Sequence, residues 1–338
     1  MQWTEEKLNE LLTRPSEALN DFMSKLDADI AIFGAGGKVG ATIAEMASRS
    51  MAAVNCPHKI VAVSRFSNAE KKAEFEKLGV HTISADLGND DDLKSLPDFK
   101  YIIFLAGRKF GTHGAESATW EANASVPTLV ARRFKGASFV VFSTGNIYPL
   151  TTAVSGGCLE TVQTSPVGEY AMSSVARERI FEYAARHYGS KVTLFRLNFA
   201  IDLRYGVLAD IAKQIVNHEA VNLSIPNFNC IWQGYVAEVA IRSLADAASD
   251  PYIINVTGPE INSTKTVALK LAAYLDEPVR FSEEGEQSFL SDASLCMKTF
   301  GFPAYGIDQL IEWQAEWILA GGKDIGAPTH FEMSSGQF

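Results

Sequence analysis

Residues 30–40 read Ile-Ala-Ile-Phe-Gly-Ala-Gly-Gly-Lys-Val-Gly, an apolar run that breaks into glycines. The first glycine permits a tight turn after a strand, the second lets the backbone approach a pyrophosphate, and the third lets the next helix pack closely. The Ala-rich segment 41–51 has a helical pattern, so its N-terminal N–H groups would face the phosphates. The stretch predicts a nucleotide phosphate site, although a plain loop between strand and helix gives the same pattern. The predicted contacts are Gly34, Gly37, Lys38, Val39 and Gly40.

Length and composition set the class of protein. The chain has 338 residues, of which 47% are hydrophobic and 21% charged, as in an ordinary globular protein with a large core. No apolar run approaches the roughly 18 residues that a membrane span needs, so we expect no membrane association. The N-terminus is acidic and amphipathic, and it lacks the basic start and apolar core of a secretory signal. We therefore expect a cytoplasmic protein.

Charge and cysteine content exclude further classes. A net charge of −10 repels nucleic acid, and no basic block offsets it. The cysteines, at 56, 158, 230 and 296, are far apart, which predicts buried thiols rather than a zinc site or disulfides. The run Asp90–Asp92 favours a helix start, because three consecutive carboxylates do not point at one ion. We expect a small-molecule substrate, no nucleic acid and no metal.

Strand and helix patterns alternate after the glycine turn. Each expected strand is short and almost wholly apolar, which is typical of a parallel sheet buried on both faces. The expected strands are 59–64, 81–84, 101–105, 138–143 and 192–197, and the helices are 69–78, 120–133 and 169–187. This order predicts an α/β fold with a Rossmann-type, doubly wound parallel sheet.

The remaining chain suggests further parts. Residues 1–27 read as a helical extension interrupted by Pro15, and 28–202 as the Rossmann domain, with a return near 228–256. Residues 203–330 are expected to form mainly a smaller α/β substrate lobe, and 331–338 a tail. Within this part the expected elements are helices near 206–217, 234–247, 264–274 and 307–320 and a strand at 252–256.

The end of the second strand indicates which dinucleotide binds. In this fold an Asp or Glu there accepts hydrogen bonds from the ribose 2′-OH and would repel a 2′-phosphate. Here the strand ends in Ser64 and Arg65, and an arginine suits a phosphate. Lys38 in the glycine turn adds a second cation. The sequence predicts NADP in preference to NAD, with a solvated surface position as the alternative for Arg65.

Two further motifs carry a family resemblance. Residues 142–148 read Phe-Ser-Thr-Gly-Asn-Ile-Tyr, and 170–174 read Tyr-Ala-Met-Ser-Ser. Together with the glycine turn, these motifs resemble the extended short-chain dehydrogenase/reductase superfamily of epimerases and dehydratases, over about residues 28–320. The resemblance implies catalytic roles for Thr144 and Tyr170. It also implies cofactor contacts at Asp86, Leu87, Ala106, Gly107, Asn123, Tyr170 and Asn198.

One position breaks the family pattern. In that family a lysine four residues after the tyrosine makes the phenolate accessible at neutral pH, and here this position is Ser174. Arg177 on the same helix face is one replacement. Alternatively, Tyr170 acts as a neutral donor, and loop residues do the acid–base work. The candidates are Lys109, His113, Asn146, Arg204, Tyr205 and Gln233, and four of them, His113, Asn146, Arg204 and Gln233, are also the candidate substrate contacts.

The resemblance implies hydride transfer on a hydroxylated, carbohydrate-like molecule. The alternative is an NAD(P)-binding protein with little or no activity, which would keep the glycine turn but would not need the rest of the family's motif residues. Helices 120–133 and 169–187 are candidates for a homodimer interface. Trp313 and Trp317, four residues apart, are expected in the core of the second lobe. The segment 322–338 either frays or folds back over the cleft.

Overall fold

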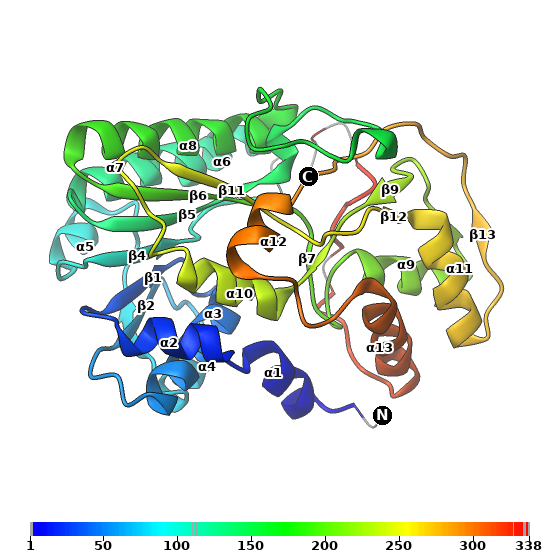
Figure 1. Cartoon of the computed structure of the whole chain (residues 1–338), viewed down its shortest axis with the longest axis horizontal. Helices are drawn as coiled ribbons and strands as arrows, with labels where there is room; N and C mark the ends of the chain where they lie inside the picture. The colour runs from blue at the N-terminus through cyan, green and yellow to red at the C-terminus, as the bar shows by residue number, and fades with distance from the viewer. Residues whose placement is uncertain (1–2, 110, 112–113, 327, 334–335, 337–338) are drawn as a thin grey trace.

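A seven-stranded parallel sheet forms the centre of the computed structural model, which describes all residues except 1–2, 110, 112–113, 327, 334–335 and 337–338 (Figure 1). The strand order is β11-β6-β5-β4-β1-β2-β3, and every neighbouring pair is parallel. The strands are β1 (Ile30–Phe33), β2 (Ile60–Ser64), β3 (His81–Ser84), β4 (Tyr101–Phe104), β5 (Ser138–Thr144), β6 (Lys191–Leu197) and β11 (Tyr252–Val256). The predicted Rossmann-type sheet is confirmed.

The strand order reverses beside β1. The chain winds outward from β1 to β3 and then returns to β4 on the other side of β1. Loops that leave the carboxyl ends of β1 and β4 therefore diverge and open a crevice, the usual ligand site of such sheets. The glycine turn lies at this point.

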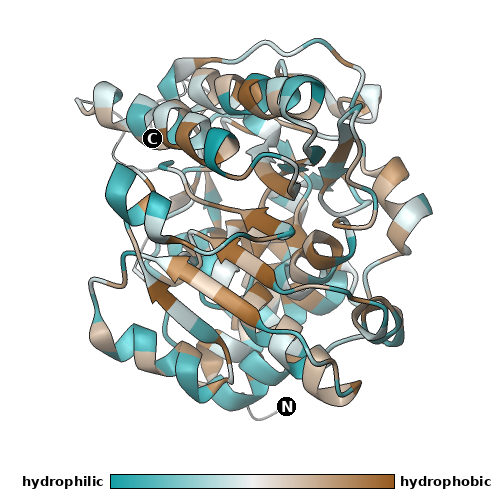
Figure 2. Ribbon diagram, turned by 90° about the vertical axis from the view of Figure 1, so that its left-hand side faces the viewer, coloured by the Kyte–Doolittle hydropathy of each residue, from teal (hydrophilic) through white to brown (hydrophobic). Residues whose placement is uncertain are grey.

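Helices cover both faces of the sheet. On one face lie α6 (Glu116–Trp120), α7 (Val126–Arg133) and α8 (Gly168–Tyr188), and on the other lie α2 (Glu17–Ser24), α3 (Lys38–Ala53) and α10 (Gln233–Arg242) (Figure 1). Alternate strand residues face the two sides, so Ile30 and Ile32 join one apolar cluster while Ala31 and Phe33 join the other. Figure 2 shows hydrophobic strands at the centre and more hydrophilic helices at the periphery.

The flanking helices at the β2 and β3 edge are α4 (Ala69–Lys77) and α5 (Asp90–Ser95). Asn89 caps α5 by accepting from the backbone N–H groups of Asp91 and Asp92. Asp90, Asp91 and Asp92 thus lie in the first turn of α5, where their negative charges interact favourably with the positive end of the helix dipole. This agrees with the predicted helix start.

Some element bounds differ from the prediction. The helix expected over 120–133 begins earlier, as α6, and passes through a π-helical segment at Glu121–Ser125 before α7. Pro127 has no N–H to donate to the carbonyl four residues back, which explains the widened turn. The helix expected over 234–247 ends at Arg242, and α12 (Ser294–Phe300) was not predicted.

A second core lies beyond the carboxyl edge of the sheet. It is built by α9 (Val207–Val216), α11 (Thr264–Leu275) and α13 (Ile307–Leu319), with Trp313 and Trp317 buried in it as predicted. Short strand pairs frame it. They are β7 (Ala200–Ile201) with β10 (Ile231–Trp232), β8 (Ala220–Val221) with β13 (Arg280–Phe281), and β9 (Asn227–Phe228) with β12 (Asn262–Ser263).

The N-terminal helices join the two regions. Pro15 separates α1 (Glu5–Thr13) from α2, and Ser16 caps α2. Leu8 of α1 is buried in the second core, whereas Leu19 of α2 is buried against the sheet. No helix in the described part of the chain is long and apolar enough to cross a membrane.

Candidate active site

The glycine turn has the close contacts that a phosphate-binding turn needs. Gly34 has φ +84°, and a Cβ there would lie 2.6 Å from the backbone nitrogen of Ala106. A Cβ at Gly40 would lie 2.5 Å from the carbonyl oxygen of Ala35. Helix α3 begins directly after Gly37, and no side chain caps its N-terminus. The turn therefore brings backbone donors and a helix dipole to the crevice.

Two cavities meet at this turn. One, of about 800 Å³, lies between the ends of β2 and β3 and the glycine turn. The other, of about 350 Å³, lies between the turn, α8 and the second core. Both are lined by Gly34, Gly37, Leu105 and Gly107. The two cavities are therefore continuous with the glycine turn.

Most predicted contact residues line these cavities. The larger cavity is lined by Ser64, Arg65, Asp86, Leu87 and Ala106, besides the shared glycines. The smaller one is lined by Lys38, Val39, Gly40, Thr144, Asn146, Tyr170 and Gln233. Their roles stay predictions. His113 lies outside the described residues.

Lys38 does not accompany Arg65. It lines the smaller cavity, where its Nζ lies 3.2 Å from the centroid of the Tyr205 ring. The second cation beside Arg65 is Lys71, whose Nζ donates to the carbonyl oxygen of Gly36. Sequence reasoning missed Lys71, although a helix that starts at Asn68 directly after β2 places its first turn near the strand end.

Thr144 and Tyr170 lie together in the smaller cavity. Thr144 ends β5, and Tyr170 lies in the first turn of α8. Burial raises the pKa of the Tyr170 phenol, and a hydrogen bond with Thr144, the charge of Arg177 and a hydrogen bond with Ser174 partly offset this rise. The phenol is therefore protonated at neutral pH and able to donate.

Ser174 does not supply the positive charge that a lysine would bring to this position. It is 1% exposed, and its hydroxyl donates to the backbone carbonyl of Tyr170 at 2.7 Å. This bond to the preceding helical turn is a common one for serine and brings no charge to the cavity.

Arg177 is the buried cation behind Tyr170. Its Nη1 donates to the carbonyl oxygen of Phe142 at 2.8 Å, and its Nη2 donates to Oδ1 of Asn123 at 2.5 Å. A Cβ on Gly107 would lie 2.3 Å from that Nη2, so the glycine leaves room for the guanidinium. Arg177 therefore supports Tyr170 electrostatically from a fixed position. Asn123, predicted as a cofactor contact, lines neither cavity and holds Arg177 instead.

Two lysines in the smaller cavity have unusual acidity. Burial lowers the pKa of Lys38 to about 8, although the negative charges of Asp202 and Asp210 act to raise it. Burial and repulsion by Lys38 lower the pKa of Lys109 to about 8. Each is therefore partly deprotonated near pH 8.

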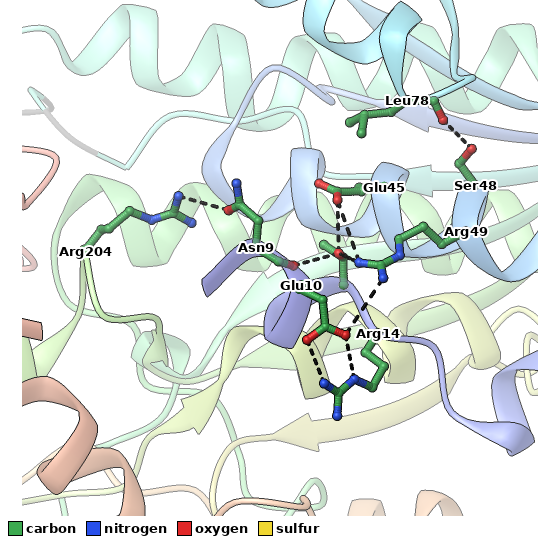
Figure 3. A network of polar contacts seen from close by, with 9 residues as sticks. Asn9, Glu10, Arg14, Glu45, Ser48, Arg49, Leu78 and Arg204 are labelled. Atoms are coloured by element: carbon green, nitrogen blue, oxygen red, sulfur yellow. Dashed lines mark hydrogen bonds and ion pairs between the residues drawn. The ribbon is translucent and has the colours of Figure 1, made fainter. Parts of the chain in front are cut away.

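Two other predicted residues lie outside both cavities. Asn198 is buried, and its amide donates to Asn229 and to the carbonyl oxygen of Phe289. Arg204 binds Asp202 and donates to Asn9 of α1, so it ties the N-terminal helix to the loop that carries Tyr205 (Figure 3). Asn198 and Arg204 therefore hold neighbouring segments in place without lining either cavity.

The C-terminal segment folds back along the smaller cavity. Thr329 lines it, and Oδ2 of Asp210 accepts from the backbone N–H of Thr329 at 2.8 Å and from its hydroxyl. Phe331 is 1% exposed in the second core, and Gly336 packs against Gly168 at the start of α8. The described part of the tail therefore packs on the protein, and Thr329 forms part of the cavity wall.

A family model agrees with this geometry. The model of the NAD dependent epimerase/dehydratase family matches residues 30–201, just over half of the chain. The chain belongs to this family. The family uses a nicotinamide cofactor, and the uncapped start of α3 has the backbone donors that a pyrophosphate would need. None of the curated proteins compared with the chain matches it.

Solved structures share the fold at low identity. UDP-glucuronic acid 4-epimerase from Bacillus cereus in complex with NAD is 16% identical, with a TM-score of 0.70 over 87% of this chain and 100% of that one. UDP-glucose 4-epimerase from Thermus thermophilus, also with NAD, is 17% identical, with a TM-score of 0.68 over 85% and 98%. RMD from Pseudomonas aeruginosa, complexed with NADPH, is 17% identical, with a TM-score of 0.67 over 86% and 98%. At these identities the likeness establishes the fold alone.

Proposed function

We propose that the chain transfers a hydride between NADP(H) and a hydroxylated, carbohydrate-like small molecule. The observation that carries this proposal is the pairing of Thr144 with a protonated Tyr170 in the cavity beside the glycine turn. A bound nicotinamide would supply or accept the hydride. The side chains of the cavity have to handle the proton.

Tyr170 is best suited to act as a general acid. In reduction, its O–H donates a proton to a substrate carbonyl oxygen while the carbonyl carbon gains a hydride, so the carbonyl becomes an alcohol. Thr144 orients that oxygen. The resulting phenolate is stabilised by the charge of Arg177 and regains a proton from solvent. The reverse reaction requires the phenolate first, and the raised pKa of Tyr170 makes that direction slower at neutral pH.

Turnover tests the proposal directly. With NADPH and a panel of keto-sugars and keto acids, the absorbance of the reduced nicotinamide should fall steadily. Tyr170→Phe should abolish most of the rate and leave NADPH binding intact, because the phenyl ring keeps the packing and loses the proton. An unchanged rate in Tyr170→Phe would remove the tyrosine from the mechanism.

Arg65 and Lys71 support NADP over NAD. Both line the larger cavity at the end of β2, which Asp86 lines as well. A charge-assisted contact to a 2′-phosphate is worth about 1.5–3 kcal/mol. Arg65→Ala and Lys71→Ala should therefore each weaken NADPH binding by about 10-fold or more and NADH binding by less than 2-fold. Lys72→Ala is the matched control on the same helix, and equal losses for both cofactors would contradict the preference.

Ser174 supports a second candidate function, cofactor binding without catalysis. Ser174 places no charge beside Tyr170, so a chain that binds NADP(H) without turning over a substrate is consistent with the site. Such a protein would bind NADPH tightly and show no consumption of it with any substrate in the panel. Sustained turnover by the wild-type chain excludes this alternative.

A further inference from the structure

A tight turn at residues 202–205, which we call the Tyr205 turn, lies between β7 and α9. Asp202 and Tyr205 exchange two backbone hydrogen bonds, of 2.9 and 3.4 Å. The carboxylate of Asp202 also accepts from the backbone N–H of Arg204 and from its guanidinium. Gly206 follows with φ +129°, a backbone conformation that favours glycine. The turn is therefore held in one conformation by its own residues.

The Tyr205 turn directs its aromatic ring toward the glycine turn. Nζ of Lys38 lies 3.2 Å from the centroid of the Tyr205 ring, which is a cation–π contact. Both residues line the smaller cavity. Lys38 is the first residue of α3, directly after Gly37. The contact therefore joins a segment that follows β7 to the start of the helix at the predicted phosphate site.

Lys38 lies where a bound anion would be stabilised. A cation in the first turn of a helix is repelled by the positive end of the helix dipole. Burial acts against the charged form as well, because it lowers the pKa of Lys38 to about 8. A phosphate group at the glycine turn would offset both effects. The Tyr205 ring, whose face is negative, contacts the same cation and supports its charge.

Helix α1 holds the Tyr205 turn in place. Nη1 of Arg204 donates to Oε2 of Glu5 at 3.0 Å and to Oδ1 of Asn9 at 3.2 Å, the second of which is drawn in Figure 3. The match to the family model begins at residue 30, so α1 lies outside it. The anchor is therefore a feature of this chain rather than of the matched family region.

The same helix is bonded to α3. The hydroxyl of Thr13 accepts from Nη1 of Arg49 at 2.6 Å, and Oε1 of Glu10 lies 3.9 Å from Nη2 of Arg49 (Figure 3). A Cβ on Gly234 of α10 would lie 2.8 Å from the carbonyl oxygen of Leu12, so α1 also packs closely on that helix. Helix α1 thus bridges the Tyr205 turn and the helix that begins at the glycine turn.

We propose that α1 holds Tyr205 against Lys38, and that this contact retains a bound dinucleotide by closing the crevice beside the glycine turn. Tyr205 is a positioning residue in this arrangement, since it acts on the cofactor site through Lys38. The inference rests on the proposed function for the binding of NADP(H). Its consequence is kinetic, because loss of the contact should speed the release of the cofactor more than it slows its entry.

Release of NADPH tests the Tyr205 contact without turnover. The full chain is loaded with NADPH and mixed rapidly with excess NADP+, and the nicotinamide fluorescence follows the dissociation. Tyr205→Leu should raise the dissociation rate constant by about 5-fold or more, because it removes a half-buried cation–π contact. Tyr205→Phe keeps the aromatic face and should stay within about 2-fold of the wild type. Equal rates for Tyr205→Leu and Tyr205→Phe would overturn the inference.

A double-mutant cycle assigns the effect to the pair. Lys38→Met removes the charge and keeps most of the side-chain length, so it should speed release by itself. In the Lys38→Met background, Tyr205→Leu should change the rate by less than about 2-fold, because the partner of the ring is already lost. Fully additive effects would mean that Tyr205 acts on the fold and not through Lys38, which contradicts the inference.

The anchor on α1 has its own variants. The double variant Glu5→Gln, Asn9→Ala removes both contacts of α1 with Arg204 and leaves the pair of Arg204 with Asp202. It should speed NADPH release by about 3-fold or more, and in the cofactor-free chain it should speed hydrogen exchange in the Tyr205 turn. Glu6→Gln changes the exposed neighbouring carboxylate and should alter neither quantity. If the folded double variant behaves as the wild type does, the role of α1 is overturned.

The outcomes separate this inference from the proposed function. Fast release from Tyr205→Leu with no consumption of NADPH by any substrate would refute hydride transfer alone. Turnover by the wild type, with release unaffected by Tyr205→Leu, would refute the inference alone. A folded chain that does not bind NADPH would refute both.

Discussion

Ser174 lies four residues after Tyr170, where the family pattern has a lysine, and its hydroxyl is turned to the helix backbone. Burial keeps the pKa of Tyr170 above its ordinary value, and Arg177 offsets only part of this rise. The chemistry of the chain therefore depends on which protonation state of one phenol the reaction uses. A neutral phenol suits proton donation, whereas a phenolate suits alcohol oxidation.

Ser174→Lys should lower the pKa of Tyr170, because a cation in the cavity favours the phenolate. For alcohol oxidation, the rising limb of kcat/KM against pH should move to lower pH by about one unit or more. Ser174→Ala is the control and should leave that limb in place. A folded Ser174→Lys variant with an unmoved profile would place the limiting proton elsewhere.

At the scale of elements, α1 is packed into the fold. Its Leu8 is fully buried in the second core, and Asn9 accepts from Arg204 on the loop beside the cavity. Helix α2 meanwhile packs on α3, which carries the glycine turn. The N-terminal helices thus fix the two walls of the site relative to each other.

Leu8→Ala should destabilise the chain by about 2–5 kcal/mol, the usual cost of emptying a fully buried leucine site. Leu269→Ala on α11, where the side chain is 50% exposed, is the matched control and should cost less than about 0.5 kcal/mol. Urea denaturation measures both. Similar small losses in the two variants would mean that α1 contributes little to the fold.

The sequence predicted elements where one local signal dominates. The apolar run 101–105 and the glycine turn each follow from short-range sterics and burial, and both match the structure. The π-helical segment before Pro127 depends on how a missing donor is accommodated, which the helical pattern does not reveal. The two-residue strands around the second core depend on tertiary pairing. Thr329 enters the site only because distant segments fold together.

At the scale of the whole molecule, a buried ion pair joins the sheet to its covering helix below the site. Arg196 of β6 donates to both oxygens of Glu178 of α8, at 2.9 and 2.8 Å. Ser143 of β5 donates to the same carboxylate, and Arg196 also donates to the hydroxyl of Tyr148. Burial raises the pKa of Tyr148 to about 12, so it stays neutral. The network fixes β5, and with it Thr144.

Glu178→Gln leaves the Arg196 charge buried without its counterion and should cost about 3–5 kcal/mol of stability. Asp21→Asn removes a carboxylate from the exposed pair with Lys25 and should cost at most about 1 kcal/mol. Chemical denaturation compares them. Equal effects would mean that the buried pair is no more important than a surface one.

The aromatic packing of the chain start has a spectroscopic consequence. Of the five tryptophans, Trp3, Trp232, Trp313 and Trp317 lie in the second core, with Trp3 edge-on to Trp313 at 5.4 Å, and Trp120 lies on α6. None of these five lies in the seven-stranded sheet. Tryptophan emission therefore reports the hydration of the second core and the docking of the first residues, and loss of the sheet alone would leave it nearly unchanged.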